Sequence, residues 1–152
     1  MKRHESLIAL SHDHHHGLML AQLIKKGAPE YKGLPTDIIG KVKYAEEAWE
    51  KELKVHFNNE EKILFPFVRG KDAKLDQLID EILVEHKQIK KLFEKLNKSS
   101  DKEAVLNNLG ILLEKHIRQE EREVFQKIQT LFKDELNELN GKIIAVKDSC
   151  ST

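Results

Sequence analysis

Eight histidines are the residues of this 152-residue chain best suited to bind a metal or transfer protons. Apart from His4, they fall in four regions: a cluster at His12, His14, His15 and His16, and single residues at His56, His86 and His116. Two of the single histidines begin the same motif, in the stretches HFNNEEKILFP from His56 and HIRQEEREVF from His116. In each motif a glutamate, Glu60 or Glu120, follows the histidine by four residues. On a helix that spacing places both side chains on one face, so both can reach one metal ion or two adjacent ions.

Four helices are expected to position these residues, because apolar residues recur at steps of three and four in four stretches. Strict alternation of the kind that predicts strands does not occur. Four amphipathic helices with short connections predict an all-α, up-down-up-down four-helix bundle. The first expected helix runs from about Ser6 to Lys26, and the second begins at a cap, Thr36 or Asp37, and is kinked or ended by Pro66. The third is expected from about Asp72 to Asn97 and the fourth from Asp101 to about Phe132. A short helix is expected over Asp134–Val146.

The single histidines fall in register with the apolar residues of their own helices, which predicts that they point into the core. His56 and Glu60 follow Trp49 and Leu53 on a stripe that continues to Ile63 and Phe67, His86 lies between Ile82 and Ile89, and His116 and Glu120 lie between Leu113 and Val124. A buried carboxylate without a partner costs several kcal/mol, so something must compensate for it. Imidazole and carboxylate together suit iron, manganese or zinc. The alternative is a buried polar network without metal.

The first helix offers several histidines, of which one is in register. His14 lies on the stripe of Leu10 and Leu18 and is the preferred ligand. His15 follows Ile8 and Ser11, faces a flank, and is the second choice. The other histidines of the cluster point to other sides of the helix, where solvent-exposed positions are expected.

The combination of motifs resembles the hemerythrin-like (HHE cation-binding) family: a histidine in LSHDHHHGL, the motif at His56, a histidine in EHKQIKKL and the motif at His116, over about Leu7 to Phe132. The resemblance implies a non-haem centre of two iron ions, with manganese or zinc as other candidates. It implies His56, His86, His116 and a first-helix histidine as ligands, and Glu60 and Glu120 as bridging carboxylates.

One departure from the family is visible. Oxygen-carrying hemerythrins have a second histidine one turn away on the third helix, where this chain has Ile82 and Lys90. One metal therefore loses a nitrogen ligand unless another group supplies it; the candidates are His15, His16, Glu61, Glu121 and water. Glu61 and Glu121 are equally expected as surface residues paired with lysines.

The function implied by the resemblance is binding or sensing of oxygen or a related small molecule, such as peroxide or nitric oxide. The alternative is an enzyme-like role: scavenging of nitric oxide or peroxide, or iron delivery for repair of iron–sulfur clusters. Whether the protein is an enzyme is left open by the sequence. Relatives with the repair role usually carry an additional cysteine-bearing domain, which is not found in this chain.

Composition excludes several other classes. Lys+Arg and Asp+Glu are both 26, so no net positive field favours nucleic acid or anionic lipid. No apolar run is long enough for a membrane span. The one cysteine, Cys150, cannot close an intrachain disulfide, and the N-terminal sequence lacks a signal-peptide core, which favours the cytoplasm. We expect one domain over residues 1–146, a disordered tail over 147–152, and a monomer or small homo-oligomer.

Overall fold

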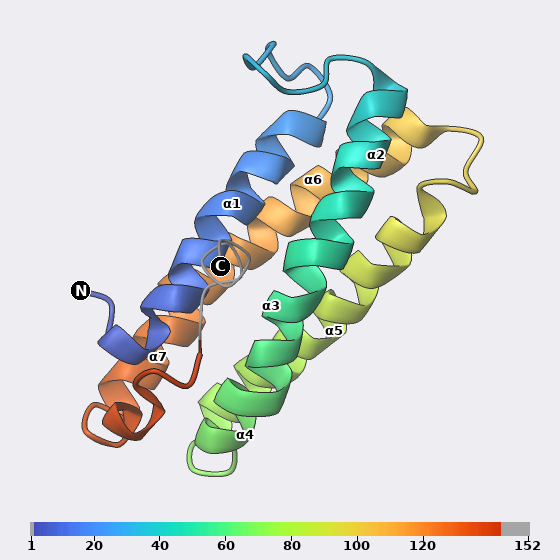
Figure 1. Cartoon of the computed structure of the whole chain (residues 1–152). Helices are drawn as coiled ribbons and strands as arrows, with labels where there is room; N and C mark the ends of the chain where they lie inside the picture. The colour runs from blue at the N-terminus through green and yellow to red at the C-terminus, as the bar shows by residue number, and fades with distance from the viewer. Residues whose placement is uncertain (1, 144–152) are drawn as a thin grey trace.

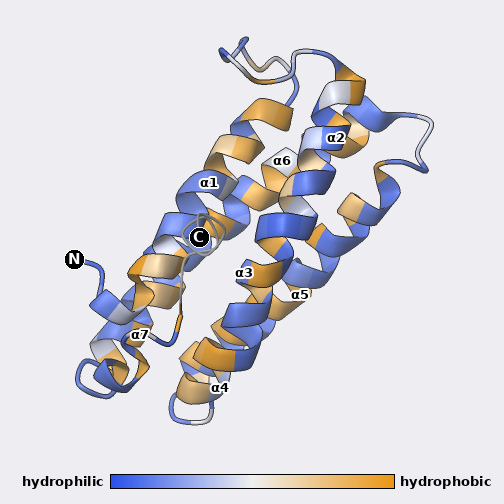
Figure 2. Ribbon diagram, in the orientation of Figure 1, coloured by the Kyte–Doolittle hydropathy of each residue, from blue (hydrophilic) through white to orange (hydrophobic). Residues whose placement is uncertain are grey.

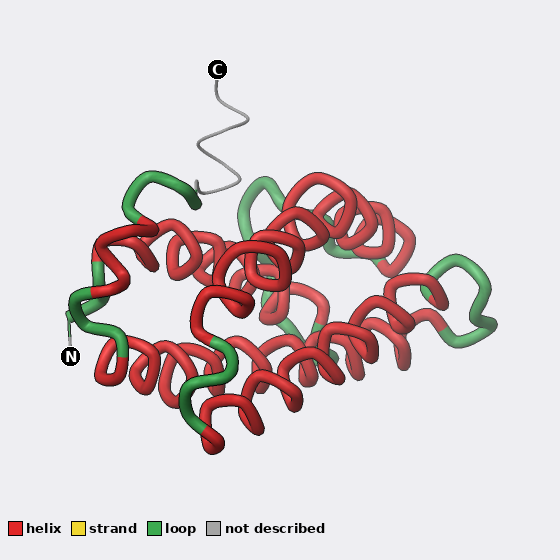
Figure 3. The backbone as a smooth tube through the Cα atoms, turned by 90° about the horizontal axis from the view of Figure 1, so that it is seen from below, coloured by secondary structure: helices red, strands yellow, loops and turns green. Residues whose placement is uncertain are grey.

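The computed structural model describes residues 2–143, and in this part of the chain four long helical segments lie side by side (Figure 1). They run alternately up and down, as the sequence predicted. No β-strand occurs within the described residues (Figure 3). Hydrophobic and hydrophilic residues alternate along each segment, as expected for helices with one buried face (Figure 2).

The four bundle helices are built from seven α-helical elements. The first bundle helix is α1 (Ile8–Ile24), which a 3₁₀ turn at Glu5–Leu7 precedes, and the third bundle helix is α5 (Ala73–Lys95). The second comprises α2 (Ile38–Ala48), α3 (Lys54–Asn59) and α4 (Phe65–Val68), and the fourth comprises α6 (Lys102–Gln119) and α7 (Phe125–Leu131). Of the short terminal helix expected over Asp134–Val146, a 3₁₀ turn at Glu135–Leu139 is present, and residues 144–146 lie outside the described residues, as do Cys150 and the expected tail.

Aspartates begin three of the bundle helices. The carboxylates of Asp37, Asp72 and Asp101 accept hydrogen bonds from backbone N–H groups three residues on, at 3.2, 2.9 and 3.1 Å. Each bond satisfies a donor that would otherwise be left without a partner in the first turn. The N-cap of the second bundle helix is therefore Asp37, one of the two residues predicted.

The second and fourth bundle helices contain π-helical turns that the sequence pattern did not predict. They lie at Trp49–Leu53, Glu60–Leu64 and Glu120–Val124. A π turn inserts about one extra residue per turn and rotates the later residues of the helix about its axis. The predicted stripe through Ile63 and Phe67 was therefore wrong by one position.

The side chains buried after Glu60 are those of Leu64, Phe65 and Val68, whereas Ile63 and Phe67 are only half-buried. In the fourth bundle helix the matching pair, Val124 and Phe125, is fully buried. The π turn that begins at each glutamate thus brings two successive apolar residues into the core.

The apolar core is divided into two clusters along the bundle. One contains Leu10, Leu64, Ile82 and Phe125, and lies toward α4 and α7. The other contains Leu20, Ile89, Leu113 and Ile117, and lies toward the opposite end. The predicted inward-facing histidines and glutamates occupy the level between these two clusters.

The first and fourth bundle helices approach closely at Gly110, which predicts that a larger residue is not tolerated there. A Cβ atom at Gly110 would lie 2.9 Å from the backbone oxygen of Ala21. Alanine favours helix by about 1 kcal/mol over glycine, but over-packing costs about 1–3 kcal/mol. The Ala21 oxygen belongs to the backbone and cannot move aside as a side chain can, so we expect the upper end of this cost. Gly110→Ala should then lower the free energy of unfolding by about 2 kcal/mol in chemical denaturation. The exposed Asn108→Ala serves as the control, and an unchanged or raised stability of Gly110→Ala would contradict the close approach.

No helix among the described residues is long and apolar enough to cross a membrane.

Candidate metal centre

Six ionisable side chains from all four bundle helices meet between the two apolar clusters. Each residue is at most 4% exposed: His14, His56, Glu60, His86, His116 and Glu120. Every one of them was expected in the core from its register. Such a concentration of buried histidines and carboxylates is unfavourable unless the groups are paired or bind a cation.

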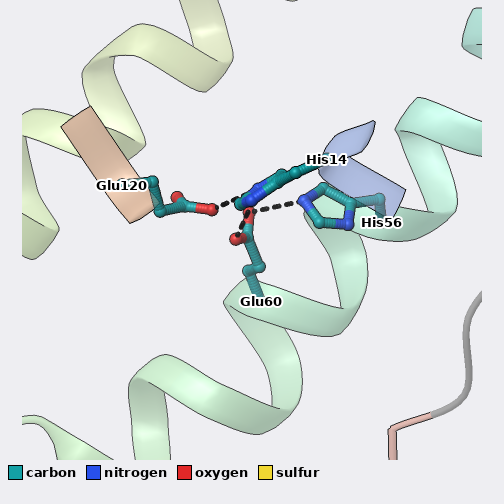
Figure 4. Close-up of side chains that lie close together, drawn as sticks. All are labelled: His14, His56, Glu60 and Glu120. Carbon is teal, nitrogen blue, oxygen red and sulfur yellow. Dashed lines mark ion pairs between the residues drawn. The ribbon is translucent and has the colours of Figure 1, made fainter. Parts of the chain in front are cut away.

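The first half of the centre contains His14 of α1 and His56 of α3 beside both glutamates (Figure 4). His14 Nε2 lies 2.8 Å from a carboxylate oxygen of Glu120 and 3.8 Å from one of Glu60. His56 Nε2 lies 3.5 Å from Glu60. One donor atom from each of the four residues lies within 4.8 Å of the others. This spacing allows all four to bind a single ion.

The second half contains His86 of α5 and His116 of α6, beside the same two glutamates. His86 Nε2 lies 3.2 Å from Glu60, and His116 Nε2 lies 3.8 Å from Glu120. Because Glu60 and Glu120 belong to both groups, two ions bound here would share them as bridges.

The outward-facing nitrogens of two histidines are held by buried carboxylates. His56 Nδ1 donates to Asp13 at 3.1 Å, and His116 Nδ1 donates to Glu85 at 2.8 Å. An ionised carboxylate only accepts hydrogen bonds, so the proton resides on Nδ1. The lone pair of Nε2 then faces the centre, as a metal ligand requires.

The other two histidines are held by the second glutamate of each motif. His86 Nδ1 donates to Glu61 at 2.7 Å, and His14 Nδ1 makes a longer contact of 3.3 Å with Glu121. Glu121 is itself bound by Arg3 at 2.9 Å and by the Ser11 hydroxyl at 3.0 Å. Among the described residues, Glu61 and Glu121 thus contact the outer nitrogens of His86 and His14, and neither forms a direct ion pair with a lysine.

The four carboxylates connect the bundle helices in a closed ring. Asp13 of the first bundle helix contacts His56 of the second, and Glu61 of the second contacts His86 of the third. In the same way Glu85 of the third contacts His116 of the fourth, and Glu121 of the fourth contacts His14 of the first. Sequence reasoning missed Asp13 and Glu85. The signal available was an acidic residue directly before His14 and before His86, a repeat that accompanies the two motifs.

The inner atoms of the centre fit a bound cation. The Nε2 atoms of all four histidines and both carboxylate oxygens of Glu60 and Glu120 are buried and lack a hydrogen-bond partner among the described residues. A buried polar atom without a partner costs about 1–3 kcal/mol, and more if it is charged. Metal ions bound to these atoms would satisfy all of them at once.

The pKa values of the glutamates differ strongly in the metal-free centre. Burial and the nearby charge of Glu120 raise the pKa of Glu60 well above its usual range. Burial also opposes ionisation of Glu120, but its close contacts with Glu60 and His14 outweigh burial and hold its pKa well below the usual range. Two carboxylates this close do not both ionise readily, so Glu60 is the one that keeps a proton.

The histidine pKa values also differ. Burial lowers the pKa of His14 and of His86. The carboxylates in close contact with them outweigh burial and raise the pKa to about 9 in both cases; these carboxylates are Glu120 and Glu121 for His14, and Glu60 and Glu61 for His86. Burial lowers the pKa of His116. At neutral pH the metal-free protein therefore carries imidazolium protons on His14 and His86.

These protons predict that metal binding depends on pH. Because a metal displaces the protons of His14 and His86, the apparent affinity should fall as pH decreases below about 9, by about tenfold per pH unit for each proton released. Calorimetry of metal binding at pH 7, in buffers of different ionisation enthalpy, should detect the release of at least these two protons. The control variant His15→Ala should release the same number of protons as the wild type when it binds metal. A binding enthalpy independent of the buffer would contradict the prediction.

The remaining histidines of the first cluster lie outside the centre. His15 is exposed, and its ring is 6.1 Å from that of His16. The structure does not bring His15 to the six-residue centre, because it lies about 100° around α1 from His14. On the third bundle helix, Ile82 is buried in the apolar core and Lys90 is exposed. Each half of the centre is thus left with two histidines.

Comparison with known families agrees with this geometry. The family model of the hemerythrin HHE cation-binding domain matches residues 4–128, which include all six residues of the centre. The chain therefore belongs to the hemerythrin HHE cation-binding family. No curated protein and no solved structure matched the chain.

Proposed function

We propose that the centre binds two iron ions. His14 and His56 would hold one ion, His86 and His116 the other, and Glu60 and Glu120 would bridge them. The support is that the two donor groups share both carboxylates and are buried. Imidazole and carboxylate donors suit iron, with manganese or zinc as competitors. We place the protein in the cytoplasm, a reducing compartment in which iron is kept ferrous.

We further propose that the two irons bind or sense dioxygen or a ligand of similar size, such as nitric oxide or peroxide. The observation that carries this proposal is that each half of the centre supplies only four donor groups. Glu61 and Glu121, the two carboxylates considered from the sequence as further ligands, contact the outer nitrogens of His86 and His14. Octahedral iron would therefore keep positions open for an external ligand.

The walls of the centre restrict the size of that ligand. The Phe57 ring stacks on His86 at 3.9 Å between centroids, and the Phe125 ring stacks on His14 at 5.4 Å. Both phenylalanines are at most 5% exposed. Bound iron would supply the electrons that hold dioxygen. The chain itself orients the imidazoles through their Nδ1–H bonds, keeps bulk water away and limits access to small molecules.

The fate of oxygen tests this function. Tag-free, iron-loaded protein is reduced without oxygen, mixed with limiting dioxygen, and followed by absorbance and an oxygen electrode. We expect uptake of about one dioxygen per chain, most of which is returned on degassing. Continued consumption of oxygen, peroxide or nitric oxide in the presence of a reductant would contradict a binding role and support scavenging. Glu120→Gln is the control without a complete centre.

A further inference from the structure

A second pair of histidines lies on the outer side of α1. His12 is exposed and His16 is half-buried, and neither belongs to the centre. Their rings are 5.0 Å apart and nearly perpendicular, and the two Nε2 atoms lie 3.4 Å from each other. In the metal-free protein the two nitrogens therefore lie within hydrogen-bonding distance of each other.

This separation is what a metal ion requires of two imidazole ligands. Two nitrogens bound to tetrahedral zinc at about 2.0–2.1 Å each lie about 3.4 Å apart. Histidines four residues apart on a helix share one face, and this spacing recurs in helical zinc sites. Because α1 fixes both backbones, little further ordering of the chain is needed to form the site.

A small pocket lies beside His16, between α1 and the second bundle helix, and Asp13, Glu52 and His56 are also among its lining residues. Its volume is about 10 Å³, which is about the space of one water molecule. The pocket therefore gives a metal ion no passage from this pair to the centre, and the pair is considered as a site of its own.

We propose that His12 and His16 form a separate surface site for a divalent transition-metal ion. This site does not depend on the function proposed for the centre. Water would complete the coordination of an ion held by two side chains.

Zinc titration of the tag-free, metal-free protein tests the surface site. We expect His12→Ala and His16→Ala each to bind one zinc equivalent fewer than the wild type. His15→Ala, which changes an exposed neighbour outside the pair, should bind as many as the wild type. Undiminished zinc binding by His12→Ala, or an equal loss in His15→Ala, would overturn the site.

The same titration separates this proposal from that of the centre. In Glu120→Gln the equivalents bound by the centre should disappear, and the one that depends on His12 should remain. If the wild type binds a single zinc that His12→Ala removes, the surface site stands and the centre does not. If all bound zinc is lost in Glu120→Gln and none in His12→Ala, the surface site is wrong.

Discussion

Glu120→Gln is expected to abolish binding of both metal ions, whereas His86→Ala should remove only one. Glu120 belongs to both donor groups, and His86 belongs to one. An amide keeps the shape of the side chain but lacks the negative charge that a bridging ligand supplies. The measurement is metal content per chain after loading and desalting.

Glu123→Gln is the matched control, because Glu123 is exposed in the same π-helical turn, Glu120–Val124. It should leave the metal content unchanged. If Glu120→Gln retains one firmly bound ion, Glu120 is not a bridge and the two halves of the centre are independent.

Metal binding is expected to raise the thermal stability of the wild type by a large amount. At a free metal concentration about 1,000-fold above Kd, each site stabilises the fold by about 4 kcal/mol. For a protein of this length 1 kcal/mol corresponds to about 2–4 °C in Tm. Loading of both sites should therefore raise Tm by about 15–30 °C, measured by calorimetry with and without a chelator.

Glu60→Gln should remove this gain while leaving the metal-free protein nearly unaffected. Burial and the charge of Glu120 raise the pKa of Glu60, so that it keeps a proton without metal, and a neutral glutamine resembles that form. We expect the metal-free Tm of the variant to lie within a few degrees of the wild type. A rise in the Tm of Glu60→Gln on metal addition as large as in the wild type would show that the ions bind elsewhere.

The fold and the inner residues of the centre could be predicted from single-helix patterns. Asp37 could be named as one of two candidate N-caps, and His14 could be preferred over its neighbours, because capping and register are properties of one helix. The shift of the buried positions by one residue after Glu60 could not be predicted. A π turn breaks the 3.6-residue period on which the prediction of Ile63 as a core residue depends.

The outer residues of the centre could not be found in the same way. Asp13 and Glu85 stand next to His14 and His86 in sequence, but adjacent residues on a helix point about 100° apart. Their partners, His56 and His116, lie on other helices. Only the packing of the four bundle helices shows that an acidic residue on one helix holds a histidine on the next.

The most direct test of the two-iron centre is the metal content and absorption spectrum of protein purified without a His-affinity step, before and after anaerobic reduction and exposure to air. We predict about two irons per chain, and absorption bands that disappear on reduction and change again with oxygen. Both should be lost in Glu120→Gln. Bound zinc in place of iron would contradict the two-iron centre, and metal content unchanged by Glu120→Gln and by His116→Ala would leave the six buried residues as a structural polar network.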